Sequence, residues 1–162
     1  MLSIVTHGPG ETLEFGRRLG AAAQEGTIIS LSGSLGAGKT WLAKGIASAY
    51  AQLNTDEVRS PAFNLVCEYE GTTSDRRVVH IDFYRLDELN ATDTQLFDEY
   101  LTDPEPLIIV EWGERFLPSL VESYLQINLL ADPEDDEARL ITLTNIGDSE
   151  AVLRLISEVT TS

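Results

Sequence analysis

Eight residues near the start of the chain have the types and spacing of a phosphate-binding loop. The segment Gly33–Thr40 reads Gly-Ser-Leu-Gly-Ala-Gly-Lys-Thr and fits the pattern G-x-x-x-x-G-K-[ST]. Its glycines let backbone N–H groups surround a polyphosphate, because a Cβ would clash or forbid the required φ. Lys39 supplies a cation for the β- and γ-phosphates, and Thr40 supplies a hydroxyl for Mg²⁺. The residues expected to bind nucleotide are Gly33, Ser34, Leu35, Gly36, Ala37, Gly38, Lys39 and Thr40.

Two carboxylates, each at the end of an apolar or nearly apolar run, complete the predicted site. Asp82 follows residues 78–81, and Glu111 follows residues 107–110. In open α/β sheets ligands lie outside the carboxyl ends of the strands, so parallel strands here would bring both acids to one edge. We expect Glu111 to join Thr40 around the metal and Asp82 to orient or deprotonate water, or to sense the γ-phosphate. With Lys39 they are the candidate catalytic residues, and an exchange of roles between the two acids stays open.

The segments on either side of the loop predict the fold that positions these residues. Residues 27–32 form a β-branched, mostly apolar run typical of a buried parallel strand, and helical spacing of apolar residues follows Lys39. Phosphates would then lie at the positive N-terminus of a helix. Residues 124–130 and 139–144 predict an antiparallel hairpin around the acidic loop 132–137. We therefore expect one α/β P-loop domain over residues 1–162, with a mainly parallel sheet, flanking helices and an added antiparallel hairpin.

Three helix boundaries are also predicted from local signals. Thr12 is expected to cap a helix that runs to about residue 24, and either Asp148 or Ser149 is expected to cap the last helix. Residues 86–100 are expected to be helical in parts, with an interruption at residues 90–94.

The charge of the chain is strongly negative and unevenly placed. Its formal net charge is −16, and residues 82–162 hold 19 acidic and 4 basic residues. Such a surface repels nucleic acid, so we expect no stable direct binding to RNA alone and contact through a basic partner protein instead. Solubility alone is an equally good explanation of the charge. No apolar run is long enough to span a membrane, no signal segment is evident and Cys67 is the single cysteine, so we expect a cytoplasmic location.

Four motifs in this order resemble the TsaE family, small bacterial ATPases of tRNA threonylcarbamoyladenosine synthesis. They are Gly33–Thr40, Ser60-Pro61-Ala62-Phe63, the run His80-Ile81-Asp82-Phe83-Tyr84-Arg85-Leu86, and Val110-Glu111-Trp112. The resemblance implies ATP and Mg²⁺ binding, and slow ATP hydrolysis that depends on TsaD and TsaB partner proteins and resets their complex. It also implies that residues 60–63 act as a switch segment. The family usually has threonine where this chain has Ala62.

Two other functions compete with a partner-dependent ATPase. A small-molecule kinase needs arginines over the transferred phosphoryl group, yet the best lid-like loop here, residues 132–137, is acidic and only Arg139 follows it. Arg85 and Arg115 lie near the two acids in sequence and are alternative sources of positive charge. A GTPase would need an Asn-Lys-x-Asp guanine motif, which the sequence lacks. Adenine is therefore favoured, and Thr12 with the loop before it is the candidate for holding it.

Overall fold

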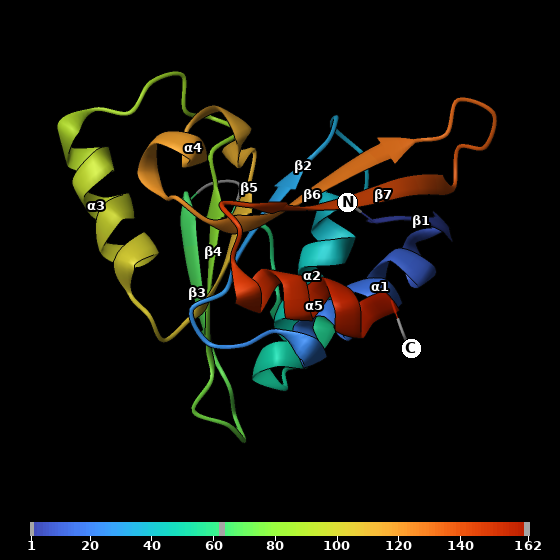
Figure 1. Ribbon diagram of the computed structural model, residues 1–162, viewed down its shortest axis with the longest axis horizontal. Helices are drawn as coiled ribbons and strands as arrows, with labels where there is room; N and C mark the ends of the chain where they lie inside the picture. The colour runs from blue at the N-terminus through green and yellow to red at the C-terminus, as the bar shows by residue number, and fades with distance from the viewer. Residues whose placement is uncertain (1, 62–63, 161–162) are drawn as a thin grey trace.

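The strands of the computed structural model, which describes residues 2–61 and 64–160, form one seven-stranded mixed sheet (Figure 1). Its order is β1-β7-β6-β2-β5-β4-β3. The central strands β6, β2, β5 and β4 are parallel, whereas β7, β1 and β3 pair antiparallel with their neighbours. The predicted fold class, a mainly parallel sheet with an antiparallel hairpin, is confirmed. The strands are β1 (Leu2–His7), β2 (Ile28–Ser32), β3 (Val66–Glu70), β4 (Arg77–Asp82), β5 (Leu107–Glu111), β6 (Tyr124–Ala131) and β7 (Ala138–Ile146).

Helices cover the two faces of the sheet unequally. Helices α1, α2 and α5 pack on one face, and α3 and α4 pack on the other. Strand β5 shows why both faces need cover, because Leu107 and Ile109 point into the first layer while Ile108 and Val110 point into the second. The helices are α1 (Pro9–Ala22), α2 (Lys39–Ala51), α3 (Ala91–Thr102), α4 (Leu117–Leu120) and α5 (Glu150–Thr160), with 3₁₀ turns η1 (Thr55–Glu57) and η2 (Gly113–Arg115).

Glycines let α1 and α2 approach closely enough for backbone to touch backbone. A Cβ at Gly16 would lie 2.5 Å from the carbonyl oxygen of Leu42, and a Cβ at Gly45 would collide with the carbonyl oxygen of Leu13. Helices α1 and α2 therefore pack directly against each other. This contact fixes the helix whose first residue is Lys39.

Two helix starts differ from the sequence prediction. Helix α1 begins at Pro9, whose fixed φ suits the first turn, so Thr12 lies inside the helix and its hydroxyl donates to the carbonyl oxygen of Gly8 at 3.1 Å. The predicted interruption at residues 90–94 is instead the start of α3. Asn90 Oδ1 accepts from the N–H of Asp93 at 2.9 Å, so the polar cluster is a helix cap.

The start of α5 agrees with one of the two predicted alternatives. Ser149 caps this helix, because its Oγ accepts from the N–H of Val152 at 3.4 Å.

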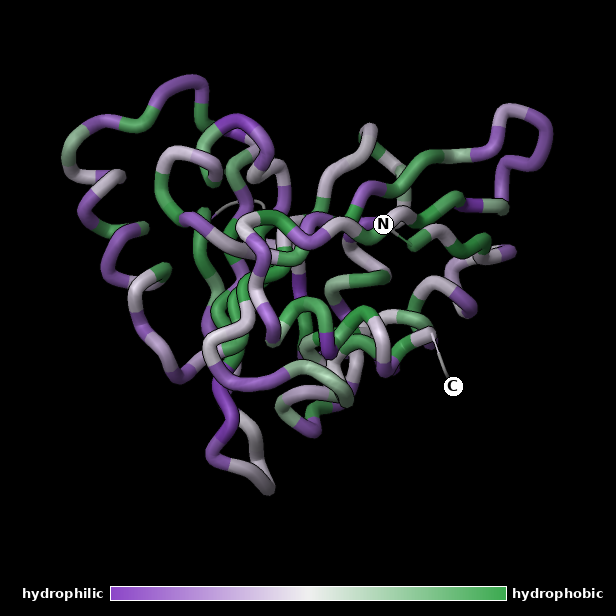
Figure 2. Tube along the Cα trace, in the orientation of Figure 1, coloured by the Kyte–Doolittle hydropathy of each residue, from purple (hydrophilic) through white to green (hydrophobic). Residues whose placement is uncertain are grey.

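Apolar residues gather in the central strands and polar residues in the loops (Figure 2). Within the described part of the chain, each helix is too short or too polar to cross a bilayer.

Candidate functional site

The predicted phosphate loop connects the end of β2 to the first residue of α2. It leaves the sheet after Ser32, and Gly33 and Gly38 have φ of +143° and +102°. Side chains other than glycine rarely adopt this left-handed region. A Cβ at Gly33 would also collide with the carbonyl oxygen of Leu129 on β6. The loop therefore needs glycine at these positions, and its backbone lies directly against a neighbouring strand.

Lys39 turns back over the loop that precedes it. The residue is 5% exposed, and Nζ donates to the carbonyl oxygens of Gly33 at 2.6 Å and Ser34 at 2.9 Å. The ammonium also lies 4.0 Å from the centroid of the Trp112 ring, a cation–π contact. Burial lowers the pKa of Lys39, while the charges of Glu111, Glu114 and Asp82 act in the opposite direction. An anion at the loop would therefore stabilise the charged form of Lys39.

Asp82 and Glu111 lie opposite each other at the ends of two parallel strands. They pair directly in the register of β4 with β5, and Glu111 is also level with Leu31 of β2. Both carboxylates are buried, with 7% and 3% of each residue exposed. Asp82 Oδ1 accepts from the N–H of Tyr84 at 2.8 Å. Burial raises the pKa of Asp82 and the nearby charge of Glu111 adds to the rise, although the bond from Tyr84 opposes it. Asp82 is thus more basic than an exposed aspartate.

The buried imidazole of His80 is hydrogen-bonded to the carboxylate of Glu111, a contact that the sequence did not predict. The His80 Nε2 and Glu111 Oε1 atoms are 2.9 Å apart, and both side chains are nearly inaccessible, at 1% and 4% exposure. An ionised carboxylate only accepts hydrogen bonds, so the imidazole N–H donates. The available signal was strand alternation, because His80 and Asp82 are two residues apart on β4 and share a face.

A cavity of about 360 Å³ brings most of the predicted residues together. Lys39, Thr40, Asp82 and Glu111 all line it, so the phosphate loop and the two acids face one space. Gly33 and Ser34 do not line it but accept hydrogen bonds from Lys39. The full lining is Leu35, Gly36, Ala37, Gly38, Lys39, Thr40, Trp41, Ser60, Asp82, Tyr84, Arg85, Glu111 and Trp112.

A second cavity of about 150 Å³ adjoins the other side of the loop. It shares Gly36, Gly38 and Trp41 with the first cavity. The rest of its lining is Gly8, Pro9, Thr12, Asp136, Glu137 and Arg139. The Nε of Arg139 donates to the carbonyl oxygen of Ala37 at 3.1 Å, which ties β7 to the phosphate loop. These residues are about a hundred positions apart, and no local sequence pattern signals their contact.

Comparison with known proteins identifies the family. The family described as "Threonylcarbamoyl adenosine biosynthesis protein TsaE" matches residues 6–141. The chain belongs to the TsaE family. The tRNA threonylcarbamoyladenosine biosynthesis protein TsaE of Streptomyces coelicolor is 35% identical over 141 residues, covering 83% of this chain and 90% of that protein. The protein of the same name from Bacillus subtilis is 34% identical over 148 residues, covering 91% and 88%.

A solved structure agrees with this membership. The crystal structure of Bacillus subtilis YdiB matches with a TM-score of 0.78 at 29% sequence identity, and the match covers 99% of this chain and 94% of that one. The predicted resemblance to the TsaE family and the predicted fold are therefore both confirmed.

The switch segment implied by the TsaE resemblance is described only in part. Ser60 lines the larger cavity, but Ala62 and Phe63 lie outside the described residues. Of the two arginines considered from sequence, Arg85 lines the cavity, whereas the Arg115 guanidinium stacks 5.3 Å from the Phe116 ring centroid and is not part of the lining.

The donor set of this TsaE-family site fits a metal ion that is held largely by phosphate and water. Across residues 2–61 and 64–160, no three His, Cys, Asp or Glu side chains converge into a metal cage. Mg²⁺ is commonly bound by one or two protein oxygens with the remaining ligands from phosphates and water. The Thr40 hydroxyl and one carboxylate of the cavity suit that pattern.

Proposed function

We propose that the chain is a Mg²⁺-dependent ATPase that acts with TsaD- and TsaB-type proteins in threonylcarbamoyladenosine modification of tRNA. The observation that carries the proposal is the register of β4 with β5, which places Asp82 and Glu111 together in the cavity of the phosphate loop. Family membership and the names of the relatives support the link to tRNA modification. This function would place the protein in the cytoplasm, where bacterial tRNA is modified.

The triphosphate would bind between the loop and the N-terminus of α2. Backbone N–H groups of residues 33–40 and the helix dipole favour negative charge there. Lys39 would exchange the carbonyl oxygens of Gly33 and Ser34 for phosphate oxygens, which provide a better partner for a buried ammonium. The smaller cavity beside Trp41 and Thr12 would take the adenine side of the nucleotide.

Glu111 and Asp82 would have different roles at the γ-phosphate. Thr40 and Glu111 would hold Mg²⁺, which neutralises developing charge on the phosphates. With Glu111 Oε1 fixed by His80, the other carboxylate oxygen is free to face the metal. Asp82, whose pKa is raised by burial, would orient the attacking water and accept its proton.

Slow hydrolysis by the chain alone is expected because the best lid-like loop, residues 132–137, carries no cation, and among the described residues only Lys39 and Arg85 bring positive charge to the lining of the cavity. The loop between β6 and β7 is acidic, and Arg139 is already bonded to the carbonyl of Ala37. Positive groups that stabilise the transition state typically contribute large rate factors. A partner protein would therefore complete or reposition the site, and hydrolysis would reset the partner complex between rounds of modification.

Association and hydrolysis assays with purified TsaD and TsaB proteins test this function. We expect the chain to bind them in an ATP-dependent way and to hydrolyse ATP faster in their presence, without transfer of phosphate to a small acceptor. An unaltered chain that neither binds them nor responds to them would contradict the proposed partnership. Rapid hydrolysis alone, or phosphoryl transfer to a small molecule, would favour a self-sufficient ATPase or a kinase.

A further inference from the structure

Part of one face of the sheet, over β1, β7 and β6, is not covered by a described helix. On the hairpin β6–β7 and the edge strand β1, alternate residues such as Ile127, Leu129 and Leu143 point into the layer of α1, α2 and α5. On the opposite face, the layer of α3 and α4 reaches the hairpin only at Tyr124 and Ile146, which lie at one end. Figure 1 shows the rest of the hairpin extending beyond α4. We call this exposed side of β1, β7 and β6 the outer face.

Three exposed aliphatic side chains lie in one row across the outer face. Val5 pairs with Leu140, and Leu140 pairs with Leu130, so their side chains are neighbours on three adjacent strands. They are 54%, 40% and 49% exposed. Isolated exposed hydrophobics are common on proteins, but a contiguous group is typical of an interaction site.

The two rows on one side of this apolar row are uncharged, whereas on its other side His7 of β1 lies 3.9 Å from the carboxylate of Asp135. The next row contains Ser3, Thr142 and Asn128, and the row after it contains Thr144 and Gln126. Solvated sheet faces are usually polar and often charged. Since solubility alone would favour charges here, the composition fits a surface that is covered by another protein.

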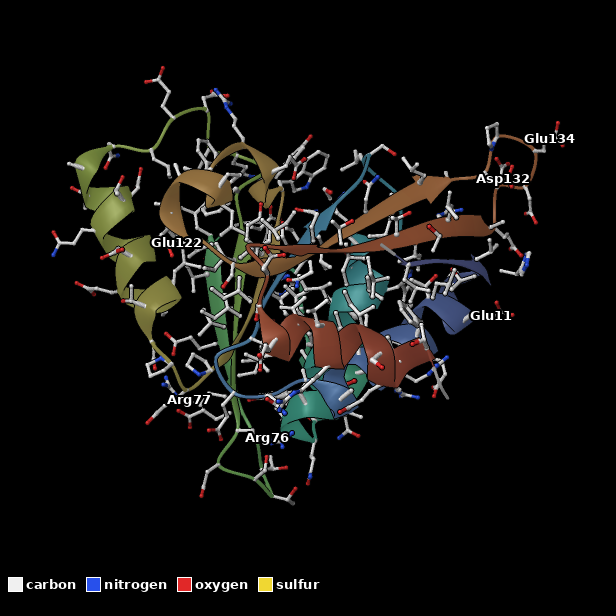
Figure 3. The ribbon with its side chains drawn as sticks, viewed as in Figure 1. Glu11, Arg76, Arg77, Glu122, Asp132 and Glu134 are labelled. Atoms are coloured by element: carbon white, nitrogen blue, oxygen red, sulfur yellow. The ribbon has the colours of Figure 1, made fainter. Side chains whose placement is uncertain are left out.

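Acidic residues lie at both ends of the outer face and indicate the charge of the partner. Asp132 and Glu134 lie in the loop at the far end of the hairpin, and Glu122 lies just before β6 at the other end (Figure 3). A second copy of this chain would bring acidic ends together in either orientation, which is unfavourable. A partner with an apolar centre and basic flanks is complementary.

The outer face belongs to the same strands that contact the phosphate loop. Leu129, next to Leu130, has its carbonyl oxygen against Gly33, and Arg139, next to Leu140, donates to the carbonyl of Ala37. A protein that fixes these two strands therefore also fixes the position of the loop. This contact gives a physical route from partner binding to hydrolysis.

We propose that the outer face, centred on Val5, Leu140 and Leu130, is the docking surface for the activating partner protein, whose matching surface is apolar with basic flanks. This inference rests on the proposed function for the identity of the partner, and it adds where the partner binds and how binding reaches the phosphate loop.

Lysine substitutions on and off the outer face test the proposal against purified TsaD and TsaB proteins. Leu130→Lys puts a charge in the apolar row on β6, and Val5→Lys does so on a different strand, β1. Leu153→Lys on α5 is the matched control, because Leu153 is 53% exposed in the opposite helical layer. We expect each outer-face variant to weaken binding by at least about tenfold and to lose stimulated hydrolysis. Thermal melting, ATP affinity and basal hydrolysis should stay unchanged, and the control should behave like the unaltered chain.

Other outcomes of these experiments distinguish a failure of the proposed docking surface from a failure of the proposed function. Full binding by both Leu130→Lys and Val5→Lys would overturn the docking surface and leave the proposed function intact. No binding by the unaltered chain would overturn the partnership and this inference with it. A dimer of the unaltered chain in analytical ultracentrifugation that Val5→Lys dissociates would show that a second copy occupies the face, which would overturn the proposed occupant.

Discussion

The hydrogen bond between His80 and Glu111 gives the sharpest quantitative prediction. Both side chains are almost inaccessible, and the two atoms are 2.9 Å apart. A hydrogen bond to a charged group contributes about 1.5–3 kcal/mol, and a buried charge that loses its partner costs more. His80→Ala should therefore lower the free energy of unfolding by about 3 kcal/mol or more, because it also leaves a cavity.

A double-mutant cycle isolates the pair from the other effects of each substitution. Glu111→Ala alone removes a buried charge as well as the bond, so its single effect can have either sign. The cycle of His80→Ala, Glu111→Ala and the double variant should give a coupling energy of about 1.5–3 kcal/mol in urea unfolding at pH 7. His80→Gln, which keeps a donor, should recover part of the loss.

A distant pair provides the control for this cycle. His80→Ala combined with Leu153→Ala on α5 should be additive within about 0.5 kcal/mol, because the two residues belong to different parts of the fold. A coupling energy between His80 and Glu111 that is no larger than this control value would refute the idea that His80 holds the Glu111 carboxylate.

Three further predictions address the acid, the helix contact and the lysine. Burial raises the pKa of Asp82 in the folded chain above its ordinary value of 3.8. The free energy of unfolding should therefore fall as pH rises from the unfolded-state pKa to the folded-state pKa, and stay lower above that range. Thermal melting at a series of pH values should show a smaller fall for Asp82→Asn. Gly45→Ala should destabilise by about 1–3 kcal/mol or more in urea unfolding because its Cβ meets α1 backbone, whereas Gly10→Ala, with nothing within 4 Å, should be neutral or stabilising. ATP should draw the Lys39 ammonium away from the Trp112 ring and so change the fluorescence emission of Trp112. The measurement uses a Trp41→Phe background, in which Trp112 is the single tryptophan. An emission spectrum that saturating ATP leaves unchanged would contradict this movement.

The parts of the site that the sequence predicts are those encoded by local patterns. The loop 33–40 is a contiguous motif, and its strand and helix follow from periodicity on either side. The shared edge of Asp82 and Glu111 was predicted only because parallel strands carry their carboxyl ends to one side. The register that sets the two acids directly opposite each other comes from the packed sheet.

The errors have equally specific causes. Asn90 favours both an interruption and a cap, and only the bond with the N–H of Asp93 decides between them. Pro9 begins α1 three residues before the expected cap at Thr12, because proline suits the first turn of a helix. The contacts of His80 with Glu111 and of Arg139 with Ala37 join residues far apart in sequence, so only the folded chain reveals them.

Calorimetric titration of ATP, with and without Mg²⁺, tests the central claim most directly. We expect Lys39→Ala to abolish binding and Lys44→Ala, further along the same helix, to retain it. Glu111→Ala should weaken binding with Mg²⁺ more than binding without it, and an equal loss in both conditions would move the metal role to Asp82. If Lys39→Ala binds ATP as tightly as the unaltered chain, residues 33–40 are not a phosphate-binding loop and the proposed site is wrong.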